Sequence, residues 1–577
     1  MPFSKLTSIH LLICATIGMP VAASSAQDAM LAKGGQAEAA IVIASDASEF
    51  ARWLAGELAG HLKKLSGAEL PIITADQLPA GKPLVVLGGP QANPLAAAAE
   101  QKQLARFADL KPDGFVLKRI DLNGVPVLLA GGNEEAATMY AAYELLERLG
   151  IVFQLTNDII PQPKPDLAMP ALDVRIEPAL KLRGMHCCHG IRFYMGLEDF
   201  RREIDQLAKL KMNVLQFYWG MGGPWAEFSY GGKKAEILYP KESGYCSWNW
   251  PNSGWTATNV TVGRECFPPD GYLGPPEFAK VQTQEEAYAT ARGFLREIIR
   301  YAHSRKVQVW LAMGEMPFVP PNLVPPAAKT FMPFYCGTAI PHGEPAMLDI
   351  WEAAVQSMIE TYPEADRYWV DTGSEIHIAA DDPQTQAMIR DYGHVREFLP
   401  KQSDQEADSI VADIAAADRL MRRIKVRYPA AKLGAELIFC GGQLRALDAV
   451  LPKDVWLMNM VNWERGSAMS DFDKIQGREL IVWPRITDDG CELNIQLNAM
   501  MYDQEETIAG SVRYGLSGVL GQLNKARGAE QSAQFIAEGA WNPSIRCESF
   551  YERYLHRLYG PEAQQKLLKA FLLLEEN

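Results

Sequence analysis

One repeating pattern constrains the fold of this chain more than any other feature. Between residues 180 and 525, an apolar segment rich in β-branched or aromatic residues is followed by a connection and an amphipathic helix, several times over. The predicted strands are 180–185, 212–218, 307–312, 367–371, 431–438, 455–460, 479–484 and 515–522. The predicted helices between them include 197–210, 283–304, 347–362, 404–428 and 497–514. Eight such units are typical of a (β/α)8 barrel, an α/β fold, and a doubly wound open sheet is the alternative.

A smaller domain is predicted ahead of the barrel. A strand at 41–43 precedes a helix with apolar periodicity at 47–65, and Asn123-Gly124 is a favoured two-residue hairpin turn. These features indicate a small α/β sandwich. A proline-rich link at 161–178 is expected to stay outside any sheet. The predicted divisions are a signal peptide at 1–26, the sandwich at 27–177, the barrel at 178–528 and a helical C-terminal region at 529–577.

The first residues resemble a secretory signal. Lys5 precedes a mostly apolar run at 6–21, and Ser24 and Ala26 are small residues at plausible cleavage positions. We therefore expect an exported protein, periplasmic or extracellular, whose mature form does not insert in a membrane. A short membrane anchor is the alternative. No later segment approaches the apolar length that spans a bilayer.

Charge and motif content exclude several classes of protein. The formal net charge is −14, without the basic stripe expected of a nucleic-acid binder. An acidic sugar is still a possible partner, because a few local cations can bind a carboxylate within an acidic protein. No nucleophile elbow, phosphate loop or dinucleotide fingerprint occurs, so no cofactor is expected.

Histidine and cysteine cluster at the end of the first predicted barrel strand, as His186-Cys187-Cys188-His189. Successive side chains of a strand point to opposite faces, so the four cannot converge on one metal ion, and no metal site is expected. His186 and His189 are candidates to contact sugar hydroxyls instead. Among the nine cysteines, Cys246 and Cys266 are the best candidates for a disulfide in an exported protein, with buried thiols as the alternative.

The predicted chemistry rests on carboxylates at the C-terminal ends of the strands, where barrel enzymes carry their reacting groups. Glu375 follows the fourth strand and is the candidate general acid. Glu464 follows the sixth strand, and Asp488 and Asp489 follow the seventh; these three are candidate bases. Glycoside hydrolysis needs one protonated and one ionised carboxyl across the scissile bond.

Further polar and aromatic residues at the same strand ends are candidates for substrate binding. They are His186, His189, Trp219, His377, Glu436, Asn462, Arg485, Lys525 and Arg527. An aromatic-rich insertion at 220–282 could offer rings for stacking on sugars, or its rings could form a small core of their own.

Four stretches of the chain, in order, resemble a known family. They are 136–153, 204–214, 368–375 and 537–543. They are similar to the α-glucuronidases of glycoside hydrolase family 67 and, more distantly, to the β-hexosaminidase-type enzymes with a similar N-terminal domain. The resemblance implies that Glu375 is the general acid of an inverting enzyme. It also implies that Glu464, with Asp488 or Asp489, positions the water.

The sequence therefore predicts an exported glycoside hydrolase that removes a terminal sugar, for which a uronic acid is one candidate, from polysaccharide-derived oligosaccharides. A catalytically inactive carbohydrate-binding barrel and a uronate lyase are the alternatives. The predicted partner is an oligosaccharide or polysaccharide; the sequence does not indicate an oligomeric state.

Overall fold

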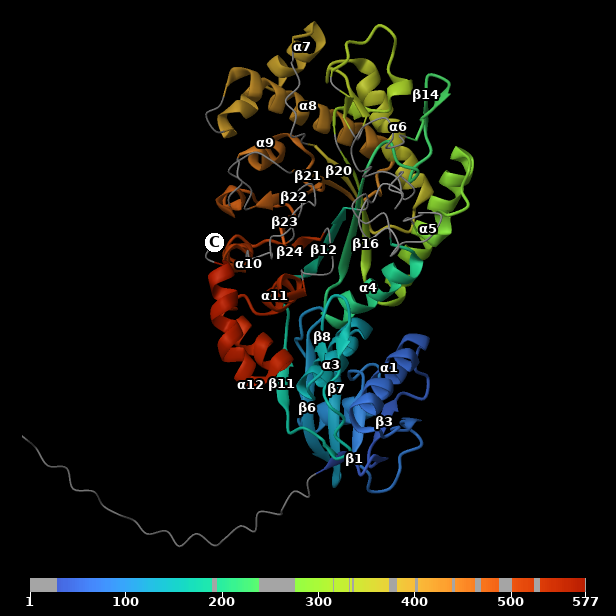
Figure 1. Cartoon of the computed structure of the whole chain (residues 1–577), viewed down its shortest axis with the longest axis vertical. Coiled ribbons are helices and arrows are strands. Elements are labelled where there is room, and N and C mark those ends of the chain that lie inside the picture. The colour runs from blue at the N-terminus through green and yellow to red at the C-terminus, as the bar shows by residue number, and fades with distance from the viewer. Residues whose placement is uncertain are drawn as a thin grey trace, which may run out of the picture.

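Eight parallel strands close into a barrel at the centre of the computed structural model (Figure 1). In order around the barrel they are β12 (Leu182–Cys188), β13 (Val214–Gly220), β16 (Gln308–Gly314), β20 (Arg367–Asp371), β21 (Leu433–Leu437), β22 (Trp456–Val461), β23 (Leu480–Pro484) and β24 (Gly518–Leu523). Each overlaps a strand predicted from the sequence. The closed parallel barrel confirms the predicted (β/α)8 fold and rules out the open doubly wound sheet.

The structure describes most of the chain, with gaps that fall mainly after barrel strands. The described residues are 29–188, 195–237, 275–314, 316–331, 333–334, 337–372, 381–399, 403–437, 442–461, 469–486, 501–523 and 530–575. The predicted signal peptide at 1–26 lies outside them.

Helices surround the barrel. They are α4 (Leu197–Lys209), α5 (Gln284–Ser304), α6 (Pro345–Thr361), α7 (Pro383–Asp391), α8 (Asp404–Arg427), α9 (Gln443–Val450) and α10 (Met501–Arg513). Helix α5 begins where Thr283 accepts a hydrogen bond from the backbone N–H of Glu286, whose carboxylate bonds back to the backbone N–H of Thr283. Short elements lie in the connections: β14 (Ser229–Tyr230), β15 (Lys233–Lys234), β17 (Phe318–Val319), β18 (Pro333–Phe334), β19 (Gly337–Ala339) and the 3-10 turns Pro276–Phe278, Pro321–Leu323, Gly393–Phe398 and Met469–Phe472.

The barrel interior is packed with large side chains. Its buried cluster is Leu182, Val214, Tyr218, Trp310, Ala312, Trp369, Met458, Met460, Ile481, Trp483 and Leu520. The rings of Trp310 and Trp369 lie 5.4 Å apart. Gly434 lies beside Trp369 on the next strand, and a Cβ at position 434 would lie 2.3 Å from that ring. Glycine is therefore needed there to make room for Trp369.

The N-terminal domain is a six-stranded sheet between helices, as the sequence predicts. The strand order is β11 (Asp173–Ile176), β6 (Phe115–Leu122), β7 (Val125–Gly132), β5 (Leu84–Leu87), β3 (Ala40–Ile43) and β4 (Ile72–Thr74). The helices are α1 (Glu49–Ser66), α2 (Pro94–Gln101) and α3 (Glu135–Arg148). Asn123 and Gly124, with φ of 59° and 81°, turn the chain from β6 into β7, which confirms the predicted hairpin.

The proline-rich segment does not stay outside the sheets, so that prediction was wrong. Within it, β10 (Leu167–Ala168) pairs with β1 (Met30–Lys33), and β11 pairs with β6. The physical reason is that both are edge strands and that the prolines of this segment flank them rather than interrupt them. The strands β2 (Gln36–Ala37), β8 (Val152–Phe153) and β9 (Asp158–Ile159) complete this domain.

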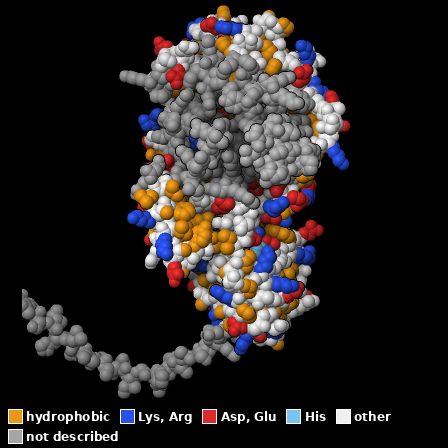
Figure 2. Space-filling view, in the orientation of Figure 1, with side chains coloured by type: hydrophobic (Ala, Val, Ile, Leu, Met, Phe, Trp, Pro, Cys, Tyr) orange, Lys and Arg blue, Asp and Glu red, His pale blue; other side chains and the backbone are white. Residues whose placement is uncertain are grey.

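The chain ends in helices, as predicted: α11 (Glu530–Trp541) and α12 (Cys547–Glu575), the latter broken at Gly560 before Pro561. Apolar side chains gather over these helices (Figure 2). Leu573 of α12 is 48% exposed. In the described part of the chain, none of the helices combines the length and the apolar character needed to cross a bilayer.

A single buried arginine joins the three parts of the molecule. Arg183 of β12 has no exposed surface and donates a hydrogen bond of 2.7 Å to Oδ2 of Asp113 in the N-terminal domain. Its guanidinium lies 4.9 Å from the ring of Trp541 in α11. Nε donates to the carbonyl oxygen of Lys211, and Nη1 donates to those of Leu180 and Lys181. The start of the barrel is therefore held against both neighbouring regions.

Candidate active site

A layer of buried polar side chains lies above the packed barrel interior, near the C-terminal ends of the strands. Its members are His186, Gln216, Tyr218, Asp371, Glu436 and Gln522. Because side chains alternate along a strand, Asp371 faces inward like Trp369 two residues earlier, and Glu436 faces inward like Gly434. This is the end of a barrel where catalytic groups are found.

Gln216 and Glu436 form the most deeply buried polar pair in this layer. Nε2 of Gln216 donates to Oε2 of Glu436 at 2.6 Å, and neither residue has exposed surface. Burial raises the pKa of Glu436 to about 8, although the hydrogen bond from Gln216 opposes that shift. Glu436 is therefore a neutral acid at neutral pH. Among the described residues, Oε1 of Glu436 and Oε1 of Gln216 are both buried without a hydrogen-bond partner. A neutral carboxyl supplies the one donor that such a pair of acceptors needs.

Tyr218 and Asp371 form a second pair. The Tyr218 hydroxyl donates to Oδ2 of Asp371 at 3.0 Å. Gly314 makes room for the phenol, because a Cβ at that position would lie 1.9 Å from the Tyr218 oxygen. Thr372 then ties the end of β20 to β21, since its N–H and its hydroxyl both bond to the carbonyl oxygen of Glu436. These contacts position the last described residues before 373–380.

His186 lies on the inner face of β12 beside these pairs. Its ring stacks on that of Trp483, with centroids 3.8 Å apart and planes inclined by 26°. Burial lowers the pKa of His186 to about 3, so the imidazole is neutral at ordinary pH. Within the described part of the chain, neither ring nitrogen has a hydrogen-bond partner. A neutral imidazole offers one donor and one acceptor, which is what a hydroxyl group can bind.

Arg485 and Trp219 lie in different surroundings. Arg485 follows β23, is half-buried, and forms a backbone bridge with Gln522 at the rim of the polar layer. Trp219 follows the inward Tyr218 on β13, so alternation turns it outward to the helices. There it is 1 % exposed, with its ring 6.1 Å from that of Trp225. The prediction that Trp219 contacts substrate is therefore corrected: it packs in the core between the barrel and its helices.

The aromatic insertion is described only in part. Trp225 and Phe228 are buried in the same helix-facing core as Trp219, which is the core-forming alternative for these two rings. Nine of the predicted site residues lie outside the described residues: His189, Glu375, His377, Asn462, Glu464, Asp488, Asp489, Lys525 and Arg527. The cysteines of the predicted disulfide, Cys246 and Cys266, lie outside them too.

Sequence reasoning did not select Gln216, Tyr218 and Asp371 as site residues. The signal that could have found them is the two-residue repeat along each strand, which places a polar residue inward just beyond a large apolar one. Asp371 after Trp369 and Gln216 after Val214 both follow that rule. Of the predicted residues, the structure brings His186, Glu436 and Arg485 to one end of the barrel.

The chain matches no protein-family model and no curated protein. Solved structures do match. A GH20 exo-β-N-acetylglucosaminidase from Vibrio harveyi, in complex with N-acetylglucosamine, has a TM-score of 0.52 and 13% identity over 95% of this chain and 76% of that chain. A GH20 β-N-acetylhexosaminidase from Streptomyces coelicolor A3(2) has a TM-score of 0.55 and 14% identity over 93% of this chain and 94% of that chain.

A GH138 enzyme targeting pectin rhamnogalacturonan II has a TM-score of 0.50 and 14% identity, over 93% of this chain and 55% of that chain. At these identities the likenesses show a shared fold, an N-terminal sheet domain followed by a barrel. They agree with the more distant of the two predicted resemblances, that to the β-hexosaminidase-type enzymes. They do not show the predicted likeness to the α-glucuronidases of family 67.

Proposed function

We propose that this protein is a glycoside hydrolase that cleaves a terminal sugar from an oligosaccharide at the C-terminal end of the barrel. The observation that carries the proposal is the buried polar layer itself. It holds a neutral carboxyl on Glu436, a hydrogen-bonded carboxyl on Asp371 and an unpartnered neutral imidazole on His186, which stacks on Trp483. The fold shared with GH20 and GH138 glycoside hydrolases supports it.

The proposed chemistry uses carboxyl groups in unlike environments. One must be protonated to give its proton to the leaving oxygen, and another must be ionised to activate water or attack the sugar. Glu375 follows Asp371 by four residues in the chain and is our proposed general acid. Glu464, Asp488 and Asp489 follow β22 and β23 closely and are the proposed partners.

The proposed sugar contacts come from the same end of the barrel. The two unpartnered nitrogens of His186 suit sugar hydroxyls, and Arg485 offers a cation to a uronate carboxylate. His189, His377, Asn462, Lys525 and Arg527 are proposed to contribute from the segments that follow the strands. The terminal sugar is proposed to be a uronic acid or, by analogy with the GH20 structures, an N-acetylhexosamine. Export by means of residues 1–26 is part of the proposal.

A panel of aryl glycosides tests this function, with aryl uronides and aryl N-acetylhexosaminides as its two central members. We expect turnover of at least one member. Glu375→Gln is expected to lower kcat by about 10²–10⁴-fold, because general acid catalysis contributes about that much. Glu552→Gln, at an exposed position of α12, is the matched control.

Three outcomes of these measurements would contradict different parts of the proposal. Near-normal activity of Glu375→Gln rejects the assignment of the acid. Binding without turnover across the panel favours an inactive carbohydrate-binding barrel. An unsaturated product that absorbs in the ultraviolet, formed from a uronate-bearing oligosaccharide, favours the lyase.

A further inference from the structure

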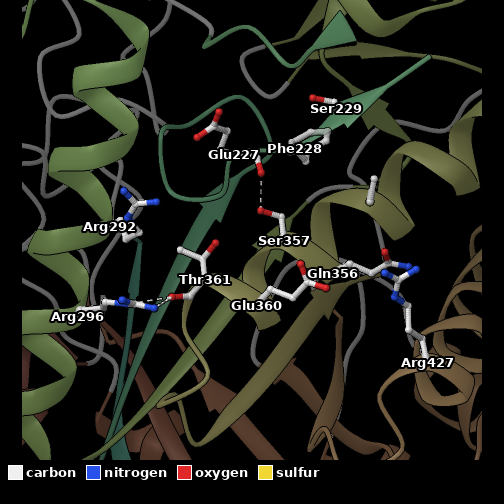
Figure 3. A pocket seen from close by; sticks show the side chains of 11 residues that line it. Glu227, Phe228, Ser229, Arg292, Arg296, Gln356, Ser357, Glu360, Thr361 and Arg427 are labelled. Carbon is white, nitrogen blue, oxygen red and sulfur yellow. Dashed lines mark hydrogen bonds between the residues drawn. The ribbon is translucent and has the colours of Figure 1, made fainter. Parts of the chain in front are cut away.

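A cavity lies on the outer side of the barrel wall, among the helices. It is open to solvent, has a volume of about 660 Å³, and lies between α5, the second half of α6 and residues 227–229, which lead into β14 and begin it (Figure 3). Thr361 ends α6 and Arg427 ends α8. In a βα barrel the helices run back toward the N-terminal ends of the strands, so these last turns lie away from the polar layer described above. The cavity is therefore separate from the candidate active site.

Three guanidinium groups line this cavity. Figure 3 shows Arg292 and Arg296 of α5 on one side and Arg427 on the opposite side. Within the described part of the chain, neither Arg292 nor Arg427 forms an ion pair with a carboxylate. Arg296 donates from Nε and Nη2 to the carbonyl oxygen of Thr361, at 3.0 and 2.8 Å, which holds its guanidinium at the cavity wall.

The carboxylates at the cavity already have partners. Glu227 pairs with Nζ of Lys234 at 2.5 Å, and Glu360 accepts a hydrogen bond from the Tyr428 hydroxyl. Lys234 neutralises Glu227, whereas Glu360 keeps its negative charge because the Tyr428 hydroxyl is neutral. The three arginines of the lining therefore leave an excess of positive charge over Glu360. In a chain with a net charge of −14, such a local concentration of cations attracts anions.

Neutral polar groups lie between the arginines. Gln356 donates from Nε2 to Glu352, which leaves its carbonyl oxygen available, and Ser229 is exposed. The Ser357 hydroxyl donates to the carbonyl oxygen of Glu227 at 2.7 Å and can still accept. Hydroxyl and amide groups suit the hydroxyls of a sugar. The cavity volume falls within the roughly 300–1,000 Å³ that is usual for sites of small ligands.

We infer that this cavity is an accessory binding site for an oligosaccharide with anionic groups on more than one sugar unit. One anionic group lies against Arg292 and Arg296 and another against Arg427, while the sugar hydroxyls contact the α6 side chains between them. The anionic group is a uronate carboxylate or a sulfate ester, which share the chemistry that a guanidinium binds. This site goes beyond the proposed function and does not depend on it.

Isothermal titration of the full chain tests the inference, with trigalacturonate, a sulfated galactose trisaccharide and neutral cellotriose as probes. We expect one or both anionic probes to bind and cellotriose not to bind at this site. Arg292→Gln/Arg427→Gln is expected to weaken the affinity of the accessory site at least tenfold. Arg300→Gln is the matched control, because Arg300 lies on the same helix but pairs with Glu297 outside the cavity. Comparison of the two anionic probes shows whether carboxylate or sulfate is preferred.

A site-resolved measurement separates this cavity from the active site. Phenylglyoxal modifies exposed arginines, and peptide mass spectrometry reports the rate at each position. Trigalacturonate or the sulfated probe is expected to slow modification of Arg292 and Arg427 several-fold and to leave that of Arg300 unchanged. Equal rates with and without both probes, or equal affinity of the double variant, overturn the inference.

The outcomes of this test and of the functional test are independent. The double variant is expected to retain wild-type turnover on aryl glycosides, and Glu375→Gln is expected to retain protection of Arg292 and Arg427. A protein without glycosidase activity that still shows this protection keeps the accessory site and loses the proposed function. A protein that turns over aryl glycosides but shows no protection of these arginines keeps the proposed function and loses the accessory site.

Discussion

Gln216 donates from Nε2 to Oε2 of Glu436 at 2.6 Å inside the barrel, with both side chains fully buried. An ionised carboxylate there would have lost its hydration in exchange for one amide donor, which is a poor replacement. Burial accordingly raises the pKa of Glu436 to about 8. The pair is thus best understood as an amide with a neutral acid, in the middle of the layer that a substrate would meet.

The first prediction concerns the pH dependence of stability. The folded-state pKa of Glu436, about 8, lies above its ordinary value of 4.5. Between these pH values the unfolded chain has released a proton that the folded chain keeps, so Glu436 makes the protein less stable as pH rises through this window. Glu436→Gln removes this effect, of up to about 1.4 kcal/mol per pH unit. Urea unfolding at pH 5, 6.5 and 8 measures it.

The variant should be close to the wild type in stability at pH 5 and more stable at pH 8. A glutamine at 436 keeps the shape, and its amide N–H replaces the donor that the neutral carboxyl supplies in the wild type. Glu552→Gln, at an exposed position, should show no such trend. A stability difference between Glu436→Gln and wild type that stays constant with pH contradicts a neutral Glu436.

The second prediction concerns the loss of stability at acidic pH. The pKa of His186 is lowered by burial to about 3, below its ordinary value of 6.5. Between these values the unfolded chain binds a proton that the folded chain does not, so stability is lost as pH falls from about 6.5. His186→Phe keeps a ring on Trp483 and removes that loss. The free energy of unfolding of the variant minus that of the wild type should therefore be about 2 kcal/mol higher at pH 5 than at pH 8.

Thermal or urea unfolding at pH 5, 6.5 and 8 checks this prediction. The same variant is informative about function, because it removes both unpartnered ring nitrogens. If His186 binds a sugar hydroxyl, KM rises in the variant although the fold is kept. An equal loss of stability on acidification in wild type and variant contradicts the neutral imidazole.

Much of the barrel could be predicted because each strand has a strong local signal. The predicted strand 367–371 coincides with β20, since an aromatic and β-branched run bounded by polar residues can be recognised without knowing its partners. The hairpin turn at Asn123-Gly124 can likewise be recognised from neighbouring residues alone. Strands β10 and β11 carry no such signal: they have two and four residues, and their pairing is decided by β1 and β6 far away in the chain.

The candidate site was harder to predict because it depends on which side chains of a strand point into the barrel and on contacts between residues far apart in the chain. Trp219 and Tyr218 are neighbours, and only the register of β13 between β12 and β16 decides which of them points inward. Gln216 and Glu436 are 220 residues apart, so nothing local marks them as a pair. His186 and Glu436 could be selected as site residues from the sequence, because the predicted strands alone place them near strand ends.

The third prediction concerns the packing below the site. A Cβ at position 434 would lie 2.3 Å from the Trp369 ring, and both residues are held by strand pairing. Gly434→Ala is therefore expected to destabilise the protein by about 1–3 kcal/mol. Gly293→Ala in α5 is the matched control: a Cβ there meets nothing within 4 Å, and alanine at an exposed helix position should stabilise by about 0.5–1 kcal/mol. Calorimetric melting of both variants measures the contrast, and equal Tm values would refute the tight fit around Trp369.

The last prediction concerns the junction of the three regions. Arg183 is fully buried; it donates to Asp113 and lies over Trp541, so its removal affects the N-terminal domain, the barrel and α11 together. Arg183→Met has a similar volume but leaves Asp113 and several backbone carbonyls without their donor. The expected cost is about 3–5 kcal/mol, as for one partner removed from a buried ion pair. Arg202→Met, whose ion pair with Asp199 involves an arginine 75% exposed, should cost less than about 1 kcal/mol.

Calorimetry is expected to show a single transition in the wild type and a lower, broadened or divided transition in Arg183→Met, because the N-terminal domain and α11 are no longer held to the start of β12. A variant that melts like Arg202→Met would mean that the apolar contacts around the junction, rather than Arg183, hold these regions together.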